Sequence, residues 1–201
     1  ERDAKGESSR GLLGKILFAV LIVGSISLLF SALWPRPLMQ MLTTENYLST
    51  ATSPGADTAL RLLSVSMFMN GLLTFSFYVL LTKHRWRPLV ATLSVGVVIS
   101  LISNLLLIPD LGFVGAALTS IGTHTALALL LLPQALRAMP ARVTRELVLR
   151  WAGFTTLLFL FLFFARPLLI GPLMTAAMLG AATAWMAFSA WVLGIHKTLK
   201  I

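Results

Sequence analysis

The sequence predicts an all-α membrane protein with six transmembrane helices. Its 201 residues are 57% hydrophobic and only 11% charged, and the mean hydropathy is +0.88. Soluble domains carry about 25% charged residues, so most of this surface is expected to face lipid. The apolar runs are long and continuous rather than alternating, which disfavours a transmembrane β-barrel.

Charged residues divide the chain into six uncharged runs, and a spanning helix needs about 20 apolar residues. These runs cover 16–34, 62–82, 88–109, 111–136, 151–165 and 167–195. The fifth run is short, so we expect 147–149 to extend it while Arg150 reaches the interface. We expect Pro109 to end the third helix, Gly112 to permit a chain reversal, and Pro133 and Pro140 to bracket the exit from the fourth helix.

The positive charges predict the orientation of the chain, because cytoplasmic loops collect Lys and Arg. With a cytoplasmic N-terminus, the inside segments hold Arg2, Lys5, Arg10, Lys15, Lys83, Arg85, Arg87, Arg137, Arg142, Arg145, Arg150, Lys197 and Lys200, and the outside holds only Arg36, Arg61 and Arg166. Both termini are therefore predicted to be cytoplasmic. The net charge of +9 lies in short loops rather than on one face, which argues against nucleic acid as a partner.

The expected organisation follows from these spans. It comprises a cytoplasmic segment 1–11, four spans in 12–138, a cytoplasmic amphipathic connector 139–149, two additional spans in 150–195 and a cytoplasmic tail 196–201. The connector is expected either to lie on the membrane surface, with Arg142 and Arg145 at the head groups, or to be an ordinary solvated loop. The segment 35–57 is expected to be an ordered or semi-ordered outer loop. Because the chain starts at Glu1, we expect it to be a piece of a longer protein.

Residues for covalent chemistry are not evident in the sequence. It has no cysteine, and no metal-ligand cluster, nucleophile–base set or phosphate-binding loop is apparent, so no catalytic, cofactor or metal residues are predicted. The candidates are polar residues in or beside the spans, which are costly in lipid and therefore candidates for function. They are Arg61, Asn70, Asn104 and His124.

Each candidate has a functional and a structural interpretation. His124 lies within the fourth span, where it either couples protons or contacts substrate, or is a neutral imidazole bonded to a neighbouring helix. Arg61 starts the second span on the outer side, where it either reaches the head groups or binds phosphate. Asn70 and Asn104 either join helices by hydrogen bonds or contact substrate.

Two further expectations concern packing. Gly115, Thr119 and Gly122 are expected to share one face of the fourth span and to let a neighbouring helix approach closely. The five tryptophans are expected to face lipid or the membrane interface. They are Trp34, Trp86, Trp151, Trp185 and Trp191.

The segment 104–117 reads NLLLIPDLGFVGAA. It resembles a run of the form N-x-x-L-I-P-x-x-G-x-x-G-A-A in the C-terminal half of polysaccharide (lipid-linked oligosaccharide) flippases, in the multidrug/oligosaccharidyl-lipid/polysaccharide exporter superfamily. The resemblance covers about residues 12–138, and the last two spans are similar to the extra pair of fourteen-helix members. It implies that this chain forms the C-terminal lobe portion of a larger 12–14-helix transporter, without the N-terminal lobe.

The resemblance also implies a function. The parent protein would flip a polyprenyl-pyrophosphate-linked oligosaccharide across the bacterial plasma (inner) membrane by alternating access, using a proton or sodium gradient and no cofactor. Its partners would be the lipid bilayer, the lipid-linked oligosaccharide and the missing N-terminal lobe. No covalent step is needed, so an enzyme is not expected. In this interpretation His124 is the coupling group and Arg61 is the phosphate contact.

Other functions remain open. A drug or cation exporter of the same superfamily would need acidic residues inside the bundle, and no Asp or Glu lies deep in a predicted span. A membrane-embedded glycan polymerase or glycosyltransferase would need carboxylates in a large outer loop, where only Glu45 and Asp57 occur. A structural subunit that assists assembly of other membrane proteins is the fourth alternative.

Overall fold

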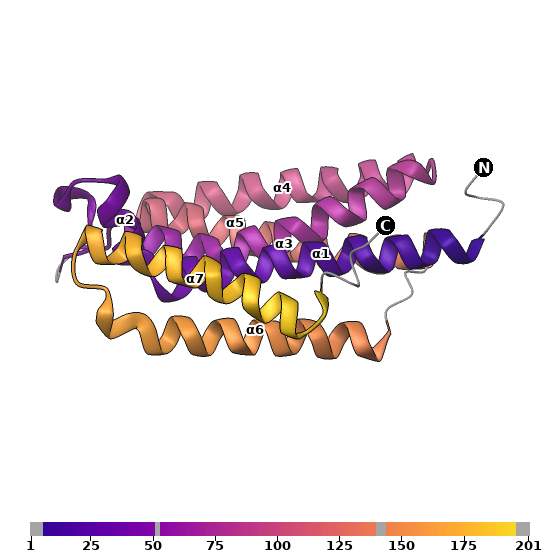
Figure 1. The fold of residues 1–201 in the computed structure, drawn as a ribbon. Coiled ribbons are helices and arrows are strands. Elements are labelled where there is room, and N and C mark those ends of the chain that lie inside the picture. Colours follow the sequence, from indigo (N-terminus) through magenta and orange to yellow (C-terminus); the bar gives the residue numbers. More distant parts are fainter. Residues whose placement is uncertain (1–5, 51–52, 140–143, 196–201) are drawn as a thin grey trace.

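The computed structural model describes residues 6–50, 53–139 and 144–195. In these residues the chain is helical, and six helices are long and apolar enough to cross a membrane, which confirms the predicted fold class. The elements are α1 (Gly6–Leu33), α2 (Pro35–Leu42), η1 (Glu45–Tyr47), α3 (Ala56–Thr82), α4 (Trp86–Leu111), α5 (Phe113–Ala138), α6 (Arg145–Ala165), η2 (Arg166–Leu168) and α7 (Pro172–Val192) (Figure 1).

The six long helices run side by side with alternating direction (Figure 1). Their most extensive contacts follow the spatial order α4–α5–α3–α1–α6–α7, and α7 also contacts the short helix α2. Although α3 and α4 are consecutive, α4 packs mainly on α5 and meets α3 only to a small extent. The helices therefore form an array in which α1 and α3 are central.

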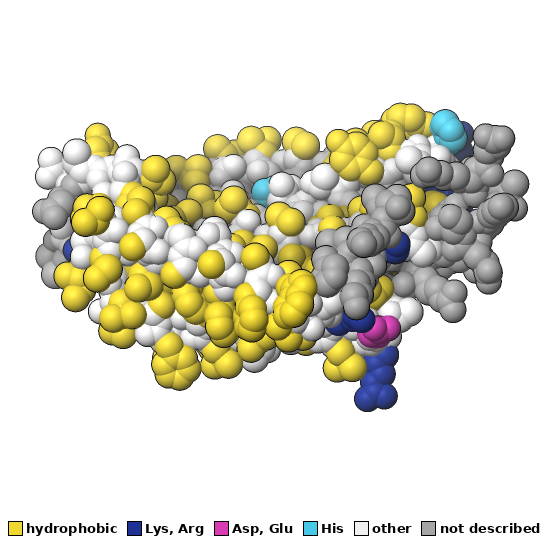
Figure 2. Space-filling model, viewed as in Figure 1, with side chains coloured by type: hydrophobic (Ala, Val, Ile, Leu, Met, Phe, Trp, Pro, Cys, Tyr) yellow, Lys and Arg dark blue, Asp and Glu magenta, His cyan; other side chains and the backbone are white. Residues whose placement is uncertain are grey.

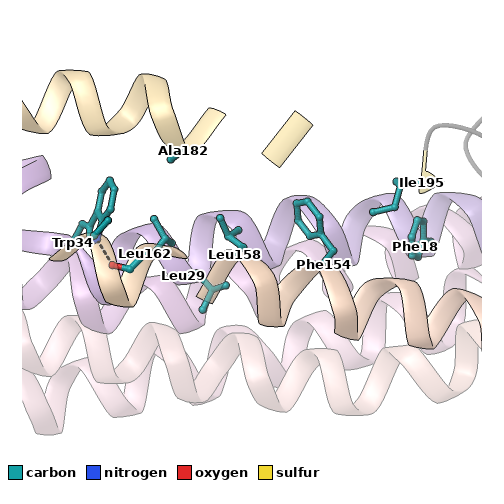
Figure 3. Close-up of a cluster of buried hydrophobic side chains, with 9 residues drawn as sticks. Phe18, Leu29, Trp34, Phe154, Leu158, Leu162, Ala182 and Ile195 are labelled. Atoms are coloured by element: carbon teal, nitrogen blue, oxygen red, sulfur yellow. Dashed lines mark hydrogen bonds between the residues drawn. The ribbon is translucent and has the colours of Figure 1, made fainter. Parts of the chain in front are cut away.

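Two clusters of buried side chains hold the array together. One joins α1 to α6 and α7 and contains Phe18, Leu29, Trp34, Phe154, Leu158, Leu162, Ala165, Ala182 and Ile195 (Figure 3). The other joins α1 to α3, α4 and α5 and contains Leu13, Leu17, Phe75, Val79, Leu80, Leu89, Leu131 and Ala135. Because lipid is as apolar as these side chains, close packing rather than escape from water is what favours these contacts. Helix α1 contributes to both clusters.

Pro109 lies inside a helix, contrary to the prediction that it ends the third span. It lies in the last turn of α4, which continues to Leu111. Helix α5 ends at Ala138, which falls between Pro133 and Pro140 in the sequence, as predicted. A proline removes one backbone hydrogen bond, and neighbouring helices in a membrane protein can hold the segment helical across that gap.

Gly112 alone forms the chain reversal between α4 and α5, as predicted from the sequence. Gly112 has φ +55°, in the left-handed region that favours glycine. Three residues later, a Cβ atom added to Gly115 would lie 2.3 Å from the backbone oxygen of Leu107. The absence of a side chain at Gly115 therefore lets α4 and α5 touch through their backbones, as predicted. Thr119 is also buried, but Gly122 is exposed and meets no other residue, so the predicted packing face is only partly occupied.

Helix α6 begins at Arg145, after the N-cap residue Thr144. Residues 147–149 therefore extend the fifth span, as predicted, and the later part of the expected connector 139–149 belongs to this helix. Residues 140–143, which include Arg142, lie outside the described residues. The guanidinium of Arg150 pairs with Glu146 and donates a hydrogen bond of 2.8 Å to the carbonyl oxygen of Gly194, just beyond α7.

The described part of the loop between α1 and α3 is ordered by hydrogen bonds at the start of α3. The carboxylate of Asp57 accepts bonds of 2.7 Å from both the backbone N–H and the hydroxyl of Ser49. The hydroxyl oxygen of Ser49 in turn accepts a 2.7 Å bond from the N–H of Gly55. A carboxylate in the first turn of α3 also interacts favourably with the positive end of the helix dipole.

Charge divides the two ends of the array, and Figure 2 shows Lys and Arg gathered mainly at one of them. We call the end with the α3–α4 turn the basic end. It carries Lys15, Lys83, Arg85, Arg87, Arg137, Arg145 and Arg150, and the opposite end carries Arg36, Arg61 and Arg166. The other six predicted inside charges fall on residues or side chains that the structure does not describe. The described charges follow the predicted asymmetry.

The expectation that all five tryptophans face lipid or the membrane interface is wrong for Trp34, and two others, which are half-buried, turn their indole N–H groups inward. Trp34 is fully buried and donates its indole N–H to the carbonyl oxygen of Leu162 at 2.9 Å (Figure 3). The other two inward-facing indoles are Trp151, bonded to the hydroxyl of Ser25 at 3.0 Å, and Trp185, bonded to the carbonyl oxygen of Leu157 at 3.2 Å. Trp86 and Trp191 are exposed, as predicted. A buried indole N–H needs a partner, and α1 and α6 provide these partners.

Candidate functional site

His124 is held between two helices near the middle of the array. Its ring nitrogen Nδ1 lies 2.6 Å from the hydroxyl oxygen of Ser66 on α3. Ser66 is buried and His124 is half-buried. The structure thus contains the interhelical hydrogen bond of the structural interpretation, whereas the second ring nitrogen has no hydrogen-bond partner among the described residues.

Two hydroxyl groups on the same helix as His124 are buried without a hydrogen bond in the described part of the chain. They belong to Thr119 and Thr123. A buried hydroxyl without a partner costs roughly 1–3 kcal/mol. Helix α5 therefore places more polar groups inside the array than its packing against neighbouring helices requires.

A groove runs between α1 and α3 on the surface of the array, with a volume of about 440 Å³. We call it the α1–α3 groove, and its lining residues are Ala19, Val20, Val23, Gly24, Ser27, Met67, Asn70, Gly71 and Thr74. The small residues Gly24 and Gly71 bring the two helices close together: a Cβ atom on Gly71 would lie 3.3 Å from Val20, and one on Gly24 would lie 2.9 Å from Phe68.

Three polar side chains interrupt this apolar groove. Asn70 and Thr74 are exposed and lie one turn apart on α3, and Ser27 faces them from α1. None of the three forms a side-chain hydrogen bond with any described residue. Polar side chains within a span normally face the bundle interior or a water-filled cavity rather than lipid. The α1–α3 groove is therefore a surface that needs a polar partner.

The structure brings two of the four predicted candidates near each other. Asn70 lies one turn beyond Ser66 on α3, and Ser66 holds His124. The α1–α3 groove and the His124 hydrogen bond thus adjoin through one helix.

The other two candidates lie elsewhere. Arg61 is exposed, and its distance of about two and a half turns from Asn70 puts it on the other side of α3. Asn104 is half-buried on α4, which packs mainly on α5 rather than on α3. Neither side chain forms a hydrogen bond within the described part of the chain. The four residues therefore do not form one site.

The sequence interpretation missed Ser27, Ser66 and Thr74. A signal for two of them was available, because Ser66, Asn70 and Thr74 recur at four-residue spacing, which places them along one side of a helix. Ser27 had no such signal, since its position beside Asn70 depends on how α1 packs against α3.

The fold and the groove together define a class: a multi-pass helical membrane protein with an open, partly polar groove between its two central helices. Among the described residues, no three His, Asp or Glu side chains come together as a metal site. Comparison with protein-family models, with curated proteins and with solved structures finds no match to this chain. The functional argument therefore depends on the residues and their arrangement.

Proposed function

We propose that this chain is the C-terminal part of a transporter that flips a polyprenyl-pyrophosphate-linked oligosaccharide across the bacterial plasma membrane. The observation that carries the proposal is the α1–α3 groove, which presents Asn70, Thr74 and Ser27 within a spanning region, without partners among the described residues. Sugar hydroxyls are donors and acceptors that match an amide and two hydroxyls. The resemblance of the segment 104–117 to polysaccharide flippases supplies the identity of the cargo.

In this proposal the α1–α3 groove faces a hydrophilic path between two lobes, and the N-terminal lobe forms the other wall. Rocking of one lobe against the other would expose the path to each side of the membrane in turn. The groove lining contains no carboxylate, which favours a sugar over an organic cation as the cargo. The basic end would be cytoplasmic, because positive loops stay inside.

His124 is proposed as the coupling group because it adjoins this path through Ser66 and because its second ring nitrogen has no partner in the described part of the chain. Arg61 is proposed as an outer contact for phosphate, since it is exposed at the end of α3 away from the basic end. The guanidinium offers two parallel donors to a phosphate group.

The proposal is tested by thiol accessibility, since these 201 residues contain no cysteine and any cysteine elsewhere in the parent can be replaced first. Single-cysteine variants Asn70→Cys and Thr74→Cys, in membranes containing the full-length parent, should react with a membrane-impermeant maleimide. The controls Val98→Cys and Leu105→Cys lie on the exposed face of α4 and should not react, because that face meets lipid. Equal and low reactivity at all four positions would show that the groove is not wet.

Transport supplies the second measurement. Asn70→Leu keeps the branched shape of the side chain and removes its hydrogen-bonding groups, so we expect flipping of the lipid-linked oligosaccharide to fall. The matched control is Met67→Leu, an apolar exchange within the same groove. Unchanged transport in Asn70→Leu, with normal protein levels, would remove the groove from the path.

A further inference from the structure

A second cavity lies between α1 and α6 toward the basic end. This α1–α6 cleft has a volume of about 110 Å³ and is lined by four residues of α1, from Gly14 to Leu21, and by three of α6, from Leu147 to Trp151. All of these lining residues are apolar. The only polar atom of the Trp151 side chain, its indole nitrogen, is already bonded to Ser25. Apolar cavities of comparable size, roughly 150 Å³, stay dry and accept hydrocarbon.

Positive charge borders the α1–α6 cleft. Arg145 lies one turn before the lining residue Val148 on α6. The guanidinium of Arg145 is exposed and has no acidic partner in the described ranges. The nearby carboxylate of Glu146 is paired with Arg150. Among the described residues, the rim of the cleft therefore offers positive charge and no uncommitted carboxylate.

We propose that the α1–α6 cleft binds an anionic phospholipid, with part of an acyl chain between the two helices and the phosphate at Arg145. Two observations select this occupant: the lining is hydrocarbon-like, and the charge of the rim complements an anionic head group. Val148, at 46% exposure, leaves the cleft open on the side of α6. Basic pockets between transmembrane helices on the cytoplasmic side are suited to anionic head groups. The proposal does not depend on what the protein transports.

The test compares lipids on the purified 201-residue chain in a neutral detergent. Thermal unfolding is followed while dioleoylphosphatidylglycerol, dioleoylphosphatidylcholine or inorganic phosphate is added, and bound lipid is counted by native mass spectrometry. We expect phosphatidylglycerol to raise the unfolding temperature and to remain bound, whereas phosphatidylcholine has a smaller effect and phosphate has none. Equal stabilisation by the two lipids, or stabilisation by phosphate alone, would overturn the proposal.

Paired variants then locate the site. Arg145→Gln should weaken phosphatidylglycerol binding about fivefold, as expected for the loss of one basic residue at a membrane surface. Arg85→Gln removes the same charge from the same end but away from the cleft, and it should leave binding unchanged. An equal loss in both variants would mean that the charge acts diffusely, which contradicts a defined site.

A second pair tests the cleft itself. Val148→Trp should fill the cleft from its open side and reduce the number of retained lipids, whereas Leu149→Trp adds the same bulk at an exposed position outside the lining. Both substitutions lie at exposed positions, so neither is expected to disturb the core. Retention of lipid in Val148→Trp at the level of Leu149→Trp would exclude the acyl-chain position.

Discussion

Trp34 offers a sharp test of how α1 is joined to α6. Its side chain is fully buried, and its indole N–H is bonded to the carbonyl oxygen of Leu162. Leu162 lies in the last turn of α6, where carbonyl groups lack partners within the helix. Trp34→Phe keeps most of the aromatic volume but removes the donor, so a buried carbonyl loses a hydrogen bond.

The expected cost follows from that geometry. Leaving a buried acceptor without its partner costs about 1–3 kcal/mol, and interhelical bonds in membrane proteins average about 0.6 kcal/mol, so we expect a loss of about 1–2 kcal/mol. Trp34→Ala also leaves a cavity and should cost about 3–5 kcal/mol.

The assay is reversible unfolding in mixed micelles with increasing dodecyl sulfate, followed by circular dichroism. Trp191→Phe is the matched control, because Trp191 is 69% exposed and its substitution should change the free energy of unfolding by less than about 0.5 kcal/mol. If Trp34→Phe were as stable as Trp191→Phe, the inferred cap on α6 would be wrong.

Three other predictions concern packing and hydrogen bonds and use the same unfolding assay. Gly115→Ala should lower the free energy of unfolding by about 1–3 kcal/mol, because the added Cβ meets a backbone atom of α4. In Gly122→Ala the added Cβ meets open space, so this variant should be more stable by up to about 1 kcal/mol. Equal effects of the two substitutions would contradict the close contact at Gly115. Arg150→Met should cost about 1–3 kcal/mol and speed hydrogen exchange at the end of α7, where its guanidinium donates to a carbonyl, and unchanged exchange would refute this role. Ser66→Ala should lower the free energy of unfolding by about 0.6 kcal/mol. The double variant of Ser66→Ala and His124→Ala should lose less than the sum of the two single variants, because both remove the same hydrogen bond. Full additivity would mean that the hydrogen bond contributes nothing.

The six spans were predictable because their signal is local. A long uncharged run has few alternatives to a helix once it enters lipid, where each backbone group must find a partner within the segment. Pro109 was misleading for the opposite reason. Whether this proline ends a helix depends on the neighbours that hold the remaining turns in place, and these neighbours come from other parts of the chain.

The tryptophans and the polar candidates show the same limit. Trp34 and Trp191 both lie near ends of apolar runs, yet only packing determines that one is buried and the other exposed. Asn70 was singled out as a polar residue within a predicted span, but its position beside Ser27 depends on the contact between α1 and α3. Arg61 shares a helix with Asn70 and still points elsewhere, since position along the sequence does not by itself identify the face that a neighbouring helix covers.

The sharing of α1 between both buried clusters has a consequence for biosynthesis. Helix α1 leaves the ribosome before the other long helices of this chain. The helices that cover its two faces are synthesised at different times. The face for α3 can be covered early, whereas the face for α6 stays bare until Phe154 and Leu158 have entered the bilayer. If synthesis stopped after α5, α1 would have one face packed on α3 and one apolar face without its partner helix α6. Membrane quality-control proteases and insertion chaperones can recognise an apolar face of this kind.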